Sequence, residues 1–137
     1  MNRQILRELA EERARDAWAL QYSRQWSGLY YLAGYVVECG LKACIAKLTT
    51  QDDFPDKNFA RDCFTHDIGD LIRLAGLQSL VKHETDHQTP VGKNWLIVKD
   101  WNEQARYQLW SETVARKMFA AATDANTGVL MWIKNHW

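Results

Sequence analysis

Residues 27–48, SGLYYLAGYVVECGLKACIAKL, are apolar on nearly every side of the helix that they would form. A helix that is apolar all round is expected in the centre of a bundle, where other helices cover it. Gly34 and Gly40 each cost about 1 kcal/mol in a helix relative to alanine. We therefore expect a neighbouring helix or subunit to approach closely at these glycines. The stretch predicts an all-α fold around one central helix.

Helical periodicity on both sides of this stretch predicts an up-and-down bundle of four to five helices. The first helix is expected over about residues 2–25, and the last over about 113–135 with a bend at Gly128. A loop over 49–64, rich in Asp and containing Pro55, follows the central helix. Short extra helices are expected over 66–74, 77–89 (ending before Pro90) and 93–103. Without a repeat or a linker, residues 1–137 form one domain.

Individual residues are expected to mark the ends and the inner faces of these helices. Ser27 and Thr65 are the predicted N-caps, and Gly76 is expected to end the helix at 66–74. The predicted inward-facing side chains of the first and last helices are Ile5, Leu6, Leu9, Ala10, Ala17, Leu20, Tyr22, Val114, Met118, Ala121, Ala122, Ala125, Val129, Trp132 and Ile133.

The charge balance and the cysteine content bound the class of protein. Seventeen basic residues balance seventeen acidic ones, so there is no broad basic field for coating nucleic acid. Three cysteines are too few for a disulfide framework, and Cys39 and Cys44 are expected in the core. Glu38 and Lys42 interrupt the longest apolar run, and no signal region opens the chain. We expect a cytoplasmic protein that does not enter the membrane.

Seven tryptophans and five tyrosines are many for a chain of 137 residues. Large rings that do not fit inside a small bundle commonly lie at a subunit interface, which favours a homodimer. The alternative is a partly exposed core rich in aromatic residues.

His83, Glu84 and His87 form the pattern H-E-x-x-H, which in metalloproteases places two zinc ligands and a general base on one helix face. The surrounding residues are polar, and Pro90 follows where further helical turns would be needed. Glu103 and His136 are the candidates for a third ligand, but no spacing selects either. The pattern is therefore interpreted as a solvated, charged segment, and neither a metal nor any other cofactor is expected.

Glu38 and Lys42 lie four residues apart, in the order that favours an ion pair on a helix. Two interpretations of this pair remain open. It is an ion pair at the rim of the bundle, or Glu38 organises a polar site with His66, Arg106 or Tyr107. In the second case Arg106 is the preferred cation for a buried Glu38.

Three segments resemble the HEPN domains (higher eukaryote and prokaryote nucleotide-binding). They are residues 28–44, the string THDIGDL at 65–71 and the string DWNEQARY at 100–107. They occur in the family's order, and the likeness spans about residues 15–133. The resemblance implies a helical bundle, usually dimeric, with a polar groove at the dimer interface.

Many members of that family are RNA-cleaving toxins that carry R-x4–6-H on a late helix. In this chain no histidine follows Arg106 or Arg116 within seven residues. Arg61 and His66 match the spacing, but in a loop that leads into a short helix. Other members bind nucleotides, RNA or a partner nucleotidyltransferase without cutting RNA.

The sequence thus predicts a non-catalytic module that binds a nucleotide or RNA, partnered with a nucleotidyltransferase in a toxin–antitoxin or defence system. The residues expected to bind are Glu38, Lys42, His66, Arg106 and Tyr107. The first alternative is a metal-independent ribonuclease acting at a dimer interface, with Arg61 and His66 as candidate catalytic residues. Two further alternatives are a structural protein-interaction domain and, last, a zinc hydrolase using His83, Glu84 and His87.

Overall fold

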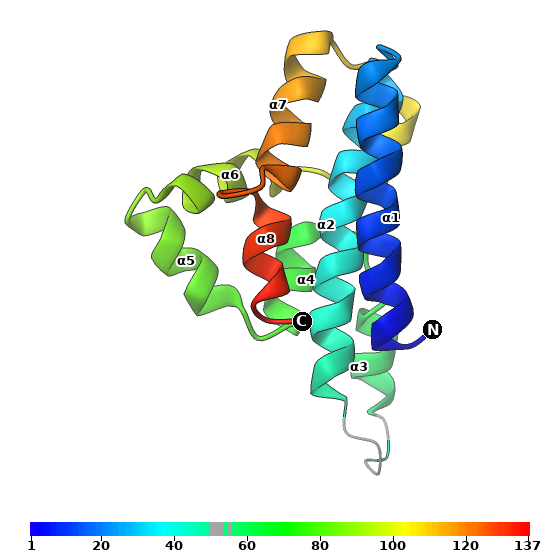
Figure 1. Cartoon of the computed structure of the whole chain (residues 1–137). Coiled ribbons are helices and arrows are strands. Elements are labelled where there is room, and N and C mark those ends of the chain that lie inside the picture. Colours follow the sequence, from blue (N-terminus) through cyan, green and yellow to red (C-terminus); the bar gives the residue numbers. More distant parts are fainter. Residues whose placement is uncertain (50–53, 55) are drawn as a thin grey trace.

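The computed structural model describes residues 1–49, 54 and 56–137, and in these ranges the chain is helical without a strand. The predicted all-α bundle with short extra helices is confirmed (Figure 1). The helices are α1 (Arg3–Tyr22), α2 (Trp26–Leu48), α3 (Lys57–Asp62), α4 (Ile68–Leu74), α5 (Gln78–Asp86), α6 (Pro90–Val98), the 3-10 helix η1 (Glu103–Tyr107), α7 (Glu112–Thr123) and α8 (Val129–Lys134).

Helix α2 is the central helix, as predicted, and most of its residues are buried. It packs along α1 and also contacts α4, η1, α7 and α8. The Trp101 ring lies so close to Gly34 that a Cβ atom there would overlap it. A Cβ atom on Gly40 would lie 3.1 Å from the side chain of Ile133. Both glycines therefore allow a close approach, the reason expected from the sequence.

By length and mean hydropathy alone, α2 passes the test for a helix that could cross a membrane. Within its most apolar window, 72% of the residues are buried inside the bundle. The core helix of a globular domain passes the same test, so the hydropathy of α2 is explained by its central position.

Helix α1 is shorter than predicted, because its C-cap is Ser23 rather than a residue near Gln25. Leu6, Ala10 and Ala17 are buried against the bundle as expected. Ile5 and Tyr22 are exposed, so the prediction that they face inward was wrong. Ile5 lies in the first turn of α1 and Tyr22 is its last residue.

The predicted last helix is in fact two helices. The turn at residues 124–128 separates α7 from α8, because the Asp124 carboxylate accepts hydrogen bonds from the backbone N–H groups of Asn126 and Thr127 at 2.9 and 2.8 Å. These bonds replace the helical ones, and a break rather than a bend at Gly128 results. Val114 and Ala125 are exposed, which corrects the predicted inner face.

Helices α5 and α6 pack together and form an arm on one side of the bundle, whereas α4 lies against α2 (Figure 1). Helix α6 begins at Pro90, whose missing N–H costs nothing at a first helical position. The expected start near residue 93 was therefore three residues late. Gly76 has a φ of +70° and ends α4, as predicted.

Two predicted N-caps and part of a predicted loop need correction. Gln25 is the N-cap of α2, whereas the Ser27 hydroxyl accepts a hydrogen bond from the backbone N–H of Trp110. Asp67, not Thr65, caps α4. Helix α3 lies within the predicted loop at 49–64, and residues 50–53 and 55 of that loop, with Pro55, lie outside the described residues.

Candidate functional site

Glu38 is a carboxylate in the most buried helix of the chain, with a relative exposure of 2%. Its Oε1 atom accepts a hydrogen bond from Nζ of Lys42, one helical turn later, at 2.8 Å. The side chain of Lys42 is 19% exposed, so its ammonium group lies between the core and the surface. The Glu38–Lys42 ion pair predicted from the i, i+4 spacing is confirmed. It is largely buried between helices rather than exposed at the rim of the bundle.

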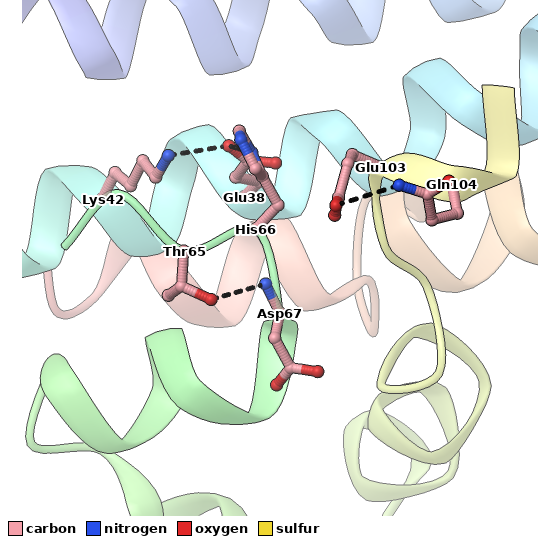
Figure 2. Close-up of polar contacts among 7 residues, drawn as sticks. All are labelled: Glu38, Lys42, Thr65, His66, Asp67, Glu103 and Gln104. Carbon is pink, nitrogen blue, oxygen red and sulfur yellow. Dashed lines mark hydrogen bonds and ion pairs between the residues drawn. The ribbon is translucent and has the colours of Figure 1, made fainter. Parts of the chain in front are cut away.

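His66 is the second partner of Glu38, and it comes from the segment before α4. Its Nδ1 atom lies 2.8 Å from the same Oε1 atom (Figure 2). Because a carboxylate only accepts, Nδ1 donates, and Nε2 of a neutral ring is left as an acceptor. The His66 side chain is 46% exposed, so solvent and a ligand can reach Nε2.

The backbone on both sides of His66 is held by hydrogen bonds. The Thr65 hydroxyl accepts from the N–H of Asp67 at 3.1 Å (Figure 2). The Asp67 carboxylate caps α4 by accepting from the N–H of Asp70 at 2.9 Å. These local bonds fix the entry into α4. The THD sequence thus supplies the imidazole and its support together.

The second oxygen of Glu38, Oε2, is buried and has no hydrogen-bond partner among the described residues. A buried carboxylate with an unused oxygen costs stability, and an aliphatic side chain of similar size would pack in its place at less cost. The charged group therefore needs an explanation other than stability of the fold. Burial of this kind together with specific charge partners is typical of functional sites.

Glu103 extends the site from η1, beside the turn of α2 that carries Glu38 (Figure 2). Its pKa is lowered chiefly by a hydrogen bond to its own backbone N–H, then by the Gln104 side chain and by the charges of His66 and Arg106. Glu103 therefore stays ionised next to His66. From the sequence, Glu103 was predicted only as a possible third zinc ligand, and no pattern in the chain indicated its place beside His66.

Arg106 and Tyr107 are exposed at the end of η1. The Arg106 guanidinium lies 5.0 Å from the centre of the Tyr107 ring. Its pKa is raised, first by a hydrogen bond with Tyr107 and then by one with Tyr31 of α2. The partners of Glu38 are Lys42 and His66, so the preferred pairing of Glu38 with Arg106 was wrong. Lys42 reaches Glu38 within its own helix, and Arg106 remains free for another role.

Tyr31, Tyr35, Glu38 and Lys42 recur every three or four residues and therefore share one face of α2. The rings of Tyr31 and Tyr35 are stacked, with centroids 6.3 Å apart. At 1.5 Å per residue this face is about 16 Å long. Tyr31 is among the groups that raise the pKa of Arg106, which places Arg106 near the Tyr31 end of this face. The cations are therefore spread along a strip. This strip, from Arg106 to Lys42 and His66, is called the α2 strip below.

The cysteines are poor nucleophiles in this structure. Burial raises the pKa of Cys39 to about 11 and that of Cys44 to about 11. Burial likewise raises the pKa of Cys63, which is only partly buried. Their prediction as core residues is confirmed for Cys39 and Cys44. Burial raises the pKa of Tyr35 to about 12, so Tyr35 keeps its proton.

Arg61 does not join the α2 strip. It lies on α3 with a side chain that is 75% exposed, and its ion-pair partner is the adjacent Asp62 at 3.5 Å. His66 instead pairs with Glu38. Spacing along the chain paired Arg61 with His66, but in the structure Arg61 pairs with Asp62 and His66 with Glu38.

The H-E-x-x-H string lies on α5 and is exposed at both histidines. Nδ1 of His87 lies 2.8 Å from the backbone oxygen of His83, and the Glu84 carboxylate accepts from the Thr89 hydroxyl. Over the described residues, no three histidine, cysteine or carboxylate side chains are grouped as metal ligands. His136, a candidate third ligand, instead packs against the Trp132 ring, with the two ring centroids 4.3 Å apart.

Comparison of the chain with protein-family models, with characterised proteins and with solved structures gives no match. The functional proposals below therefore rest on the geometry of the site.

Proposed function

We propose that the α2 strip binds the phosphates and bases of a nucleotide or of single-stranded RNA. The observation that carries the proposal is the buried Glu38 carboxylate, which holds Lys42 and His66 while leaving donors and acceptors of both available at the surface. Lys42 has three N–H donors, of which Glu38 takes one. A phosphate oxygen accepts such charge-assisted hydrogen bonds readily.

The aromatic and guanidinium groups at the other end of the strip support a nucleic-acid ligand over a simple anion. Tyr107 is exposed, and Arg106 lies over its ring. A base can stack on an exposed phenol ring, and an arginine can bind a phosphate with two parallel hydrogen bonds. Only a few cations line the strip, which fits a short single strand better than a duplex that presents many phosphates.

The direct test is fluorescence anisotropy with a labelled single-stranded RNA oligonucleotide, and competition by ATP. We expect Lys42→Gln and Arg106→Gln each to weaken binding by about tenfold, which is the loss of one hydrogen bond to a charged group. In each variant the slope of log affinity against log salt concentration should also fall by about one, because one fewer counterion is released on binding. Arg15→Gln is the matched control, because it removes an equal charge from an exposed pair on α1.

Equal loss in the control variant would show that binding follows net charge and not the α2 strip. No measurable RNA or nucleotide binding by the folded wild-type chain would contradict the proposal outright. Partnership with a nucleotidyltransferase stays a further proposal, which co-purification of a defined candidate enzyme with the wild-type chain would test.

A second function, RNA cleavage without a metal, is favoured by the contact between Glu38 and Nδ1 of His66. A carboxylate on one nitrogen orients the ring and makes Nε2 a better general base. Nε2 would take the proton of a 2′-hydroxyl, whose oxygen attacks the adjacent phosphorus while the bond to the 5′-oxygen breaks and that oxygen takes up a proton from water. Lys42, rather than Arg61, would neutralise the phosphate, because it shares the Glu38 carboxylate with His66.

Incubation of a defined RNA with the protein in EDTA separates binding from cleavage. Cleavage predicts a product ending in a 2′,3′-cyclic phosphate, lost in His66→Ala and absent when the RNA is replaced by DNA. If the wild-type protein binds the RNA but forms no cleavage product, the α2 strip binds RNA without cutting it, and the second function is contradicted.

A further inference from the structure

A second surface, made of residues other than those of the α2 strip, carries two exposed aromatic residues of α1. Trp18 is 59% exposed and Tyr22 is 80% exposed, and their rings are stacked with centroids 5.7 Å apart. A hollow of about 280 Å³ lies beside them, lined by Trp18, Gln21, Tyr22, Arg24 and Arg116. An indole and a phenol left in water on one helix face form the kind of patch that marks an interaction site.

The two arginines of this surface are held in place. Their guanidinium groups lie over the Trp26 ring, Arg24 at 5.4 Å and Arg116 at 4.7 Å from its centre. Both pair with Glu112, which accepts from Nε of Arg116 at 3.0 Å and from Nη2 of Arg24 at 3.4 Å. Arginines held in this way lose little conformational entropy when they bind a further group.

Arg24 has a backbone φ of +60°, directly after the C-cap of α1. Glycine or asparagine adopts this conformation at lower cost than arginine does. Arginine at this position is therefore conformationally unfavourable. Its guanidinium group on Trp26 is the compensating interaction.

The composition of the surface indicates what it binds. Two guanidinium groups face one carboxylate, so the surface has one excess positive charge and complements an acidic group. Tryptophan, tyrosine and arginine are the residues most enriched where protein partners bind tightly. The hollow of about 280 Å³ lies beside the two exposed rings and can receive one side chain of a partner.

We propose that Trp18, Tyr22, Arg24 and Arg116, named here the aromatic–arginine surface, dock a protein partner through a segment that pairs a carboxylate with a large apolar side chain. The apolar side chain lies against Trp18 and Tyr22, and the carboxylate accepts from the outer nitrogens of Arg116. An RNA strand fits this surface less well, because a single excess charge supplies little of the phosphate-driven affinity.

The test uses the full chain and a library of short random peptides displayed on phage. Selected peptides are expected to carry Asp or Glu next to a large apolar residue. Resynthesised peptides should lose about tenfold in affinity, measured by calorimetry, against Trp18→Ala and against Arg116→Gln. Replacing the peptide's carboxylate with its amide should give a similar loss. Arg116→Lys retains the charge but not the planar fork, and we expect it to rescue binding only in part.

Phe64→Ala is the matched control for loss of an exposed aromatic ring, because Phe64 is 80% exposed and belongs to neither surface, and it should bind the peptides like the wild type. Circular dichroism of each variant checks that the chain is folded. Failure to select any peptide above background, or selected peptides insensitive to Trp18→Ala and Arg116→Gln, would overturn the proposal. So would a dimer that dissociates in Trp18→Ala, or RNA binding that depends on Trp18 and Arg116. None of these results bears on Lys42 or His66, so the α2 strip is tested separately.

Discussion

Glu38 places a negative charge in the core next to one ammonium group and one imidazole. We expect Lys42→Met to lower the free energy of unfolding by about 2 kcal/mol, because it leaves the buried carboxylate with His66 alone. The double variant Glu38→Met with Lys42→Met should recover at least half of that loss, since well-packed apolar groups tolerate burial better. Urea unfolding measures both values. If Lys42→Met were as stable as the wild type, the ion pair with Lys42 would not stabilise the buried Glu38.

Arg106 contacts only exposed or partly exposed groups on the surface of η1 and α2. Arg106→Ala should therefore melt within about 2 °C of the wild type, as most surface substitutions do. The sequence alone favoured a structural role, in which the same variant would lose about 3 kcal/mol. Thermal unfolding followed by circular dichroism distinguishes the two, and a strongly destabilised variant would restore the structural role.

At the scale of elements, the contact between α2 and the segment after α6 depends on one glycine. Gly34→Ala should destabilise the protein by about 2–3 kcal/mol, because its Cβ overlaps the Trp101 ring. Helix propensity by itself predicts the opposite sign, a gain of about 1 kcal/mol. Gly28→Ala in the same helix is the control, since its Cβ would lie 3.3 Å from a flexible Leu20 side chain. Equal stability of the two variants would show that Trp101 can move aside.

The turn between α7 and α8 depends on an ionised side chain. Hydrogen bonds from the backbone of Thr127 and then Asn126 lower the pKa of Asp124 below its ordinary 3.8. A carboxyl whose pKa is lowered by folding stabilises the fold above its unfolded pKa, and that contribution is lost as the pH falls through the folded value. Asp124→Asn should therefore melt below the wild type at pH 7. The difference should shrink below about pH 4. A difference that stays constant with pH would show that the charge is not what matters.

At the scale of the whole molecule, self-association stays a prediction. Phe54, Phe64 and Leu109 are among the most exposed apolar side chains, and several tryptophans lie partly at the surface. We expect sedimentation at micromolar concentration to show a two-fold dimer, against 15.9 kDa for one chain. Trp18→Ala should remain dimeric, because the aromatic–arginine surface is assigned to another protein. A monomer at that concentration would contradict the predicted dimer.

Local sequence was sufficient for the helical class, the central position of α2, the close approach at Gly34 and Gly40, and the Glu38–Lys42 pair. Each of these depends on residues within one or two turns of a helix, where a spacing of three or four residues fixes which side chains meet. Gly76 ended α4 for a similarly local reason, its positive φ.

The tertiary structure alone decided which distant groups complete the site. His66 reaches Glu38 across 28 residues, and Glu103 comes beside them from η1. Arg106 was assigned to Glu38 from its chemistry, yet it contacts Tyr31 two helical turns away. Spacing also linked Arg61 to His66, which α3 and the start of α4 hold with different partners. Residues far apart in the chain meet according to how the helices pack, and that packing depends on the fit of all side chains in the core at once.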